Sequence, residues 1–199
     1  VNALGYAHPA WVEAVSHQAQ TLAHVSNLFT TGPQLDLAEK LLALANAPEG
    51  SAVFLSNSGT EANEAAIKIC LARKSGRIIA LDHAFHGRTL GALSLTHKIA
   101  YRQPFGPSAV DVTFITPEDP EILAGELEKG DVSGVFVEPI QGEAGVVPLT
   151  DEYLQQVREL TAGHDALMVV DEVQCGMGRT GRWFAHQSAH ILSLIHISE

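Results

Sequence analysis

From residue 51 to residue 172, short apolar runs alternate with segments whose apolar residues have helical spacing. Five strands are predicted by the runs "SAVFLSN", "GRIIALD", "DVTFIT", "VSGVFVEPI" and "ALMVVDE". Helices are predicted over "EANEAAIKICLARK", "PEILAGELEKG" and "DEYLQQVRELTAG". Strands that alternate with helices pair in parallel and are joined by right-handed crossovers. The sequence therefore predicts an α/β fold with a mostly parallel sheet and helices on both faces.

Two further helices are predicted before this pattern, over "AWVEAVSHQAQTLAHV" after Pro9 and over "LDLAEKLLALA". We divide the chain into an N-terminal helical part, residues 1–50, and an α/β domain, residues 51–187. Residues 188–199 are interpreted as a non-native tail, because residues 192–199, "LSLIHISE", resemble the translation of a DNA-sequencing adapter. The alternative is a natural apolar strand. The chain also begins without Met, so we expect a fragment that lacks both ends of its protein.

Composition limits the class of partner. The 199 residues are 46% hydrophobic and carry a formal net charge of -11, which predicts a globular protein that does not bind nucleic acid or an anionic membrane. Cys70 and Cys175 form no CxxC pair or disulfide framework, which suits the reducing cytoplasm. No apolar run is long enough to span a membrane. The expected partner is a small molecule.

Polar segments follow four of the predicted strands. They are "SNSGTE", "DHAFHGRT", "EPIQGE" and "DEVQCG". In open parallel sheets, ligands bind at the carboxyl ends of the strands. The sequence therefore predicts one site that is built from these four segments.

The first of these segments places Ser58, Gly59 and Thr60 between a strand and a helix. A glycine allows close approach, hydroxyl groups add donors, and a helix N-terminus offers free N–H groups, so the three could cradle a phosphate. The alternative is simple helix capping, because Ser58 and Glu61 have the spacing of a capping box.

The second segment contains Phe85 and Arg88. An aromatic ring can cover the flat face of a ligand, and an arginine can hold a carboxylate through two hydrogen bonds. The alternative is a core phenylalanine and a solvated arginine. His83 and His86 could ligate a metal, but no acid at helical spacing joins them, so no zinc site is predicted.

The third segment places Glu138 and Glu143 around a loop, either as solvated acids or as acids that line a site for amines. The fourth places Asp171 at the end of a buried strand, where a carboxylate needs a cationic or hydrogen-bonding partner. A protonated pyridine nitrogen would be such a partner, and Asp171 would keep the ring protonated as an electron sink. Gln174 could then reach a ring oxygen, whereas Glu172 points to the opposite face and is structural.

Together, "SNSGTEANEAAIK", "HAFHGRTLGALS", "VEPIQGEAGV" and "DEVQCGMGRTG" resemble the class III, fold-type I, pyridoxal-phosphate-dependent aminotransferases. The likeness extends from Val1 to about Gln187. It implies that the chain has the fold of that family's large domain, with residues 1–50 in its interface region. It also implies pyridoxal 5'-phosphate as cofactor and 2-oxoglutarate as amino acceptor, in a cytoplasmic homodimer. Among the family's amino donors, "FHGR" and "HVSNLFTT" favour N-acetylornithine over ornithine, succinylornithine and 4-aminobutyrate.

The resemblance also implies a role for each candidate residue. Its cofactor-binding positions are Ser58, Gly59 and Thr60 at the phosphate, Phe85 on the ring face, Asp171 at the ring nitrogen and Gln174 at the ring oxygen. Its substrate-binding positions are Arg88, which holds the α-carboxylate, and Glu143. Asp171 is the catalytic residue among them.

One departure from the family's pattern concerns its Schiff-base lysine, which follows "DEVQCGMGRTG" in the family. No lysine follows that motif here, and the lysines before it match no such position; they are Lys40, Lys68, Lys74, Lys98 and Lys129. We therefore expect that the chain as written does not transaminate. Two rival hypotheses are a metal-dependent hydrolase that uses His83, His86, Asp171 and Glu172, and a non-catalytic α/β remnant that binds a partner.

Overall fold

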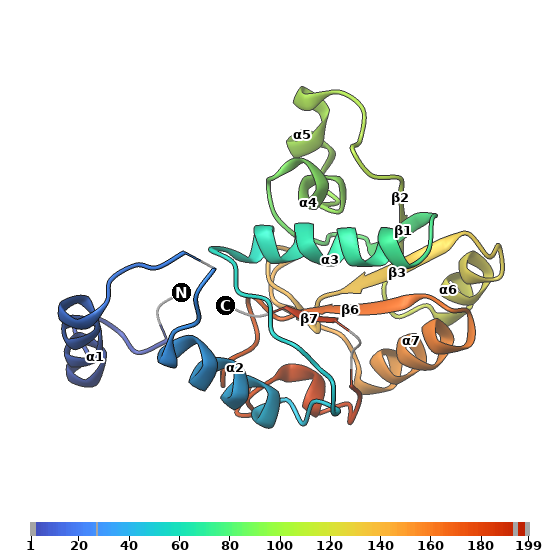
Figure 1. Ribbon diagram of the computed structural model, residues 1–199. Coiled ribbons are helices and arrows are strands. Elements are labelled where there is room, and N and C mark those ends of the chain that lie inside the picture. The colour runs from blue at the N-terminus through green and yellow to red at the C-terminus, as the bar shows by residue number, and fades with distance from the viewer. Residues whose placement is uncertain (1–2, 27, 193–194, 198–199) are drawn as a thin grey trace. The chain divides into compact units, whose positions relative to one another are not determined.

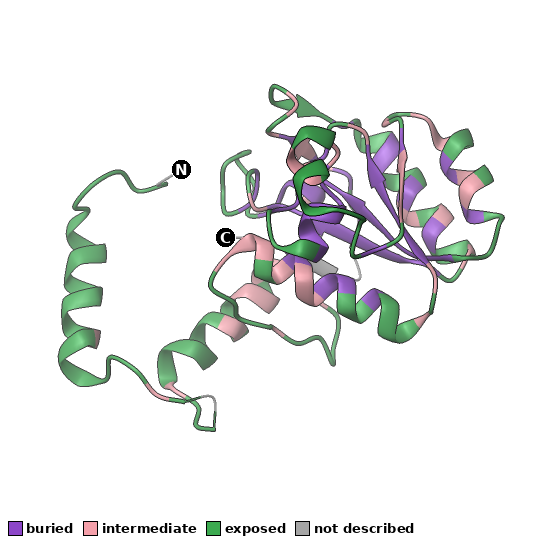
Figure 2. Cartoon of the chain, turned by 90° about the horizontal axis from the view of Figure 1, so that it is seen from above, coloured by how far each residue is buried: buried purple, intermediate pink, exposed green. Residues whose placement is uncertain are grey.

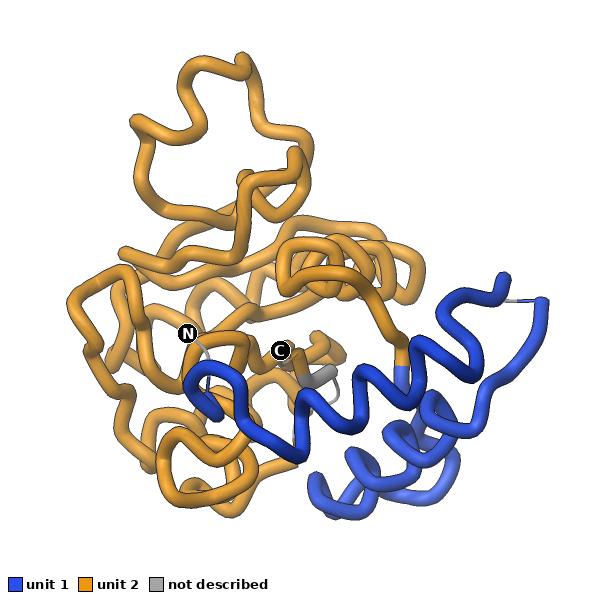
Figure 3. The backbone as a smooth tube through the Cα atoms, turned by 90° about the vertical axis from the view of Figure 1, so that its left-hand side faces the viewer, with its two compact units in different colours: residues 1–53 blue, residues 54–199 orange. Residues whose placement is uncertain are grey.

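The computed structural model describes residues 3–26, 28–192 and 195–197. The chain forms two compact units, Val1–Val53 and Phe54–Glu199, which Figure 3 colours separately. The first unit contains helices α1 (Pro9–Thr21) and α2 (Gly32–Leu44). Each begins with a proline in its first turn, where the missing N–H group costs no hydrogen bond. Both helices were predicted.

The second unit is built on a five-stranded sheet in the order β2-β1-β3-β6-β7. Its four pairings are all parallel, as predicted. The strands are β1 (Arg77–Leu81), β2 (Val112–Ile115), β3 (Val132–Val137), β6 (Leu167–Asp171) and β7 (Ile195–Ile197).

Helices cover both faces of this sheet: α3 (Gly59–Arg73) lies on one face, and α6 (Pro120–Leu127) and α7 (Asp151–Gly163) lie on the other (Figure 1). Side chains along a strand alternate between the faces. Ile78 and Ala80 therefore join the core beneath α3, whereas Ile79 and Leu81 join the core beneath α6 and α7. Strands β1, β3 and β6 are buried on both faces (Figure 2), which explains their unbroken apolar runs.

Short elements complete the unit, and the sequence analysis predicted none of them as regular structure. They are α4 (Leu90–Ser94), α5 (Ile99–Arg102), the 3-10 helices η1 (Gln103–Phe105) and η2 (Ala185–Gln187), and the antiparallel strands β4 (Ile140–Gln141) and β5 (Val147–Pro148). Their length is too short for a periodic pattern to be recognised. None of the helices that the structure describes could reach across a bilayer.

The strand predicted over residues 51–57 is wrong. Residues 51–56 have no regular structure, and Phe54 and Leu55 are 69% and 44% exposed. A strand needs a neighbour for its backbone hydrogen bonds, and the described strands pair only with one another. The prediction for residues 132–140 was too long, because β3 ends at Val137, shortly before Pro139. Within the interpreted tail, residues 195–197 form β7, while residues 193–194 and 198–199 lie outside the described part.

Gly134, in the centre of β3, has no room for a side chain. A Cβ atom there would lie 2.6 Å from Cys70 Sγ on α3. We expect Gly134→Ala to lower the free energy of unfolding by about 1–3 kcal/mol in urea titrations, because overpacking forces the helix away from the sheet. Cys70→Ala in the same background should recover part of that loss.

The control is Gly125→Ala on α6, where a Cβ atom would meet nothing within 4 Å. It should be neutral or stabilising by about 0.5–1 kcal/mol, as expected for alanine in a helix. Equal losses for the variants at Gly134 and Gly125 would contradict the close packing of α3 on β3.

Candidate active site

Asp171 ends β6 with only 5% of its surface exposed. Its Oδ2 atom accepts a hydrogen bond from Asn63 Nδ2 at 2.8 Å and lies 2.8 Å from His86 Nδ1. Its Oδ1 atom accepts from the Val173 amide at 3.1 Å. The buried carboxylate is therefore held by three groups of the chain itself, from α3, from the loop after β1 and from its own loop.

His86 is the ionisable partner of Asp171. Burial lowers the pKa of His86, but the hydrogen bond and charge of Asp171, with the charge of Glu138, outweigh it, so the pKa is raised overall. A protonated His86 balances the charge of Asp171 in a site from which water is excluded. The sequence analysis considered His86 only as a metal ligand. In the part of the chain that the structure describes, no three side chains of His, Cys, Asp or Glu converge on a possible metal position.

Asn63 was missed altogether, although the sequence contains a signal for it. Asn63 lies in register with the buried residues Ala66, Ile67 and Cys70, at the spacing of one helix face. A polar residue on an otherwise apolar face indicates a buried hydrogen-bond partner. That partner is Asp171, 108 residues away in sequence.

Two buried polar atoms next to Asp171 have no hydrogen-bond partner. They are Asn63 Oδ1 and His86 Nε2, each on a residue that contacts the carboxylate. Buried polar atoms are almost always paired, so an unpaired one needs an explanation. A polar ligand beside Asp171 would provide it.

The N-terminus of α3 is capped by Ser58, largely as the alternative of simple helix capping predicted. The Glu61 amide donates to Ser58 Oγ at 3.3 Å. The Glu61 carboxylate accepts from the Asn57 amide at 2.7 Å, whereas a standard capping box would close on Ser58. Ser58 therefore caps the helix, and this capping leaves the first helical amides, those of Gly59 and Thr60, without an intrahelical partner.

Thr60 joins α3 to the loop that follows β1. Its Oγ1 atom accepts from the Arg88 amide at 3.2 Å and lies 3.0 Å from Thr89 Oγ1. Gly87 has a φ of +133°, and a Cβ atom there would collide with the Thr60 side chain. Gly59 is similarly restricted, because a Cβ atom would collide with Val173 in the loop after β6. Three of the four predicted segments thus meet at this edge of the sheet.

Arg88 is exposed but held between two rings. Its guanidinium carbon lies 5.9 Å from the centroid of Phe85 and 5.6 Å from that of Tyr101. Such cation–π contacts orient a guanidinium group without neutralising its charge. Among the described residues no carboxylate forms an ion pair with Arg88, so it is available to an anionic ligand. Tyr101 was not predicted.

The two acids of the third segment differ in their surroundings. Glu138 is 4% exposed and accepts from the Phe85 amide at 3.1 Å, whereas Glu143 is exposed. Gln174 is exposed as well and lies beside Gly142, where a Cβ atom would be 3.4 Å from its Cγ. The fourth segment therefore adjoins the third, and all the predicted site residues belong to one edge of the sheet.

Comparison with known proteins identifies the family. The family model described as "Aminotransferase class-III" matches residues 1–197. The chain belongs to the class-III aminotransferases.

Curated relatives of this class-III chain include the acetylornithine aminotransferases of Bifidobacterium longum and Mycobacterium bovis, which are 48% and 50% identical over 94% of the chain. The match covers 48% and 46% of those proteins, so the chain spans about half the length of the curated relatives it matches. A solved ornithine aminotransferase from Toxoplasma gondii, described with partial occupancy of PLP at its active site, superposes with a TM-score of 0.89. It is 29% identical, and the match covers 97% of this chain and 47% of that one.

Glu172 has a structural role in this class-III fold, as expected. It is fully buried, and its carboxylate accepts from the His186 amide at 2.9 Å and lies 2.8 Å from His186 Nδ1. These contacts fix η2 against the end of β6. Asp171 and Glu172, which are neighbours at the end of β6, thus contact different histidines.

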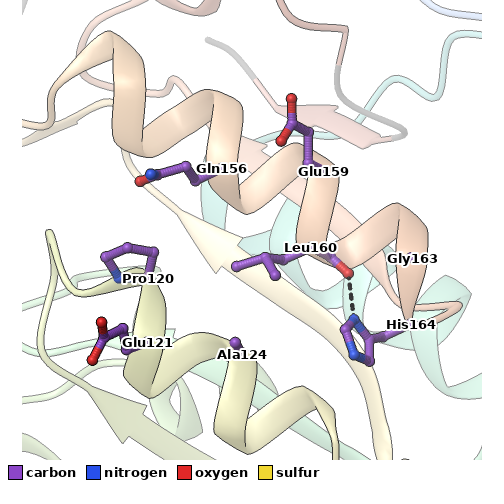
Figure 4. A pocket seen from close by; sticks show the side chains of 8 residues that line it. All are labelled: Pro120, Glu121, Ala124, Gln156, Glu159, Leu160, Gly163 and His164. Atoms are coloured by element: carbon purple, nitrogen blue, oxygen red, sulfur yellow. Dashed lines mark hydrogen bonds between the residues drawn. The ribbon is translucent and has the colours of Figure 1, made fainter.

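A surface pocket of about 430 Å³ lies between α6 and α7 (Figure 4). Its lining shares no residue with the strand-end segments. His164 in this pocket is engaged by its own helix, because its Nδ1 atom lies 2.9 Å from the Leu160 carbonyl oxygen. The pocket is therefore separate from the site of the aminotransferase motifs.

The partnership of Asp171 and His86 can be measured by NMR titration of the His86 ring in this 199-residue chain. Asp171→Asn should lower the pKa of His86 below that of the unsubstituted chain, because burial then acts without the carboxylate. The control is Asp82→Asn, which removes the partner of His97 and should leave His86 unchanged. An unaltered His86 titration in Asp171→Asn would contradict this pairing.

Proposed function

We propose that the whole protein of which this chain is a part is an acetylornithine aminotransferase with pyridoxal 5'-phosphate as cofactor. It would transfer the δ-amino group of N2-acetyl-L-ornithine to 2-oxoglutarate in arginine biosynthesis, giving N-acetyl-L-glutamate 5-semialdehyde and L-glutamate. The observation that carries the proposal is the buried Asp171 carboxylate at the carboxyl edge of a class-III fold. The names of the curated relatives support the choice of substrate.

The residues present fit the cofactor. Asp171 offers a buried negative charge, and its bonds to Asn63 and His86 fix its direction before any ligand binds. The unpaired polar atoms of the same two residues would gain partners from a polar ligand beside it. At the N-terminus of α3, the amides of Gly59 and Thr60 and the helix dipole favour a phosphate group.

When bound, pyridoxal phosphate supplies the electron sink that amino-group transfer requires. The chain's own residues then have distinct tasks. Asp171 would keep the ring nitrogen protonated, since a proton there is stabilised by the buried carboxylate. Phe85 would cover the ring face, and Gln174 would hold the ring oxygen, while Ser58 would act indirectly by capping α3.

Two further residues would bind the substrate. Arg88 would hold its α-carboxylate, because its guanidinium group is oriented by two rings and has no carboxylate partner in the described part of the chain. Glu143 would contact the amino donor from the exposed turn between β4 and β5. Arg88, Gln174 and Glu143 are all exposed here. The whole protein would be a cytoplasmic homodimer, in which the second subunit would cover them.

We also infer a separate role for each part of the chain. Residues 51–187 would form the cofactor-binding domain, residues 1–50 would belong to the subunit interface, and residues 188–199 would be a non-native tail. No lysine follows Asp171 in the sequence. The chain as written would therefore lack the group that holds the cofactor covalently and moves the proton.

The role of Asp171 is tested in the whole enzyme, cloned from the source gene. We expect Asp171→Asn to lower kcat/KM for N-acetylornithine by about 10²–10³-fold, because an amide cannot stabilise the protonated ring. The control is Asp82→Asn, which should retain activity. Faster turnover of ornithine or 4-aminobutyrate than of N-acetylornithine would refute the substrate assignment.

The inactivity of the 199-residue chain is tested by incubating it with pyridoxal phosphate, N-acetylornithine and 2-oxoglutarate. Glutamate formation should not exceed that of free pyridoxal phosphate alone, because no lysine is placed to transfer the proton. The whole enzyme in the same assay is the positive control. Glutamate formation by the chain above the free-cofactor rate would overturn this inference.

A further inference from the structure

We propose that Glu138 is a positioning residue of this site, whose buried carboxyl group holds the amide of Phe85 and thereby the loop that carries Phe85 and Arg88. The sequence analysis weighed Glu138 and Glu143 together and assigned a role only to Glu143. The inference rests on the proposed function for what Phe85 and Arg88 bind. The contact itself exists in the bare chain, where it can be tested separately.

Glu138 lies at the carboxyl end of the central strand of the sheet. It directly follows β3, which lies between β1 and β6. Its Oε2 atom accepts from the Phe85 amide at 3.1 Å, so it links the end of β3 to the loop after β1. With 4% of its surface exposed, Glu138 makes this contact where water cannot easily replace it.

Four backbone amides of this loop donate to side chains from other parts of the chain. This pattern fixes the loop at several points without regular secondary structure. The acceptors are Glu138 for Phe85 at 3.1 Å, Thr96 for His86 at 3.1 Å, and Thr60 for Arg88 at 3.2 Å and for Thr89 at 3.4 Å. Of the three acceptors, only Glu138 can change its charge in the physiological pH range.

The charge of Glu138 is sensitive to its surroundings. Burial raises its pKa to about 7; the charge of His86 and the Phe85 amide act in the opposite direction, while Asp171 and Glu143 raise it further. When the loop opens and water reaches Glu138, its pKa returns towards the ordinary value of 4.5. The closed loop is therefore most stable below pH 4.5 and loses stability as the pH rises to about 7.

His86 contributes in a different pH window. Its pKa is raised above the ordinary value of 6.5, because Asp171 and Glu138 together outweigh the effect of burial. The stability that His86 adds is fully present below pH 6.5 and is lost only above it. Between pH 4.5 and 6.5, Glu138 can therefore be observed with little contribution from His86.

The test is hydrogen exchange of the Phe85 amide, followed by NMR in the 199-residue chain without cofactor. In the unsubstituted chain, protection of this amide, corrected for intrinsic exchange, should fall by up to about tenfold per pH unit between pH 4.5 and 6.5. Glu138→Gln keeps an acceptor for the amide but cannot ionise. It should retain protection of Phe85 and lose the pH dependence.

Glu138→Leu removes the acceptor and should lower protection of Phe85 about tenfold, while the amides of β6 keep theirs. The matched control is Glu159→Gln on the exposed side of α7, which should reproduce the unsubstituted chain. Equal pH dependence in the unsubstituted chain and in Glu138→Gln would overturn the proposal. If Glu138→Leu does not fold, the comparison of the unsubstituted chain with Glu138→Gln is sufficient to test the proposal. Neither measurement depends on whether the chain binds pyridoxal phosphate.

Discussion

The buried hydrogen bonds of Asp171 determine how this edge of the sheet is arranged. An unpaired carboxylate in this position would be too costly to bury, so the first turns of α3 and the loop after β1 must both reach it. Asn63 and His86 meet this requirement from two different segments. Because both also contact the same carboxylate oxygen, the helix, the loop and β6 become one rigid assembly around Asp171.

Much of the fold could be predicted, for a physical reason. The strands β1, β3 and β6 are buried between two layers of helices, so their sequences are almost purely apolar and easily recognised. The half-buried β2 is apolar enough to be recognised as well. The run at residues 51–57 is equally apolar but has no neighbouring strand, and composition does not reveal the absence of a partner. The hairpin of β4 and β5 was missed because two residues per strand form no pattern.

The site was predictable as a location but not as a set of contacts. Parallel strands bring their carboxyl ends together, so the three segments that follow β1, β3 and β6 were bound to meet at one end of the sheet. Ser58, Gly59 and Thr60 reach the same place through the N-terminus of α3, since residues 51–56 before them form no strand. The partner of Asp171, in contrast, depends on which loop atoms turn inward. His86 was considered only as a possible metal ligand and Glu138 received no role, since a loop conformation such as the one that Gly87 permits cannot be derived from spacing.

The contacts at the end of β6 also limit which residues can stand at positions 171 and 172. Asp171 and Glu172 have the same charge, but the Asp171 side chain reaches His86 beneath α3 and the Glu172 side chain reaches His186 in η2. The shorter and the longer acid each match the distance to a different histidine. Exchanging the two residues would preserve composition, net charge and hydropathy, yet both pairs would be broken. At this position, therefore, the order of two residues with the same charge carries structural information that no property of the sequence as a whole records.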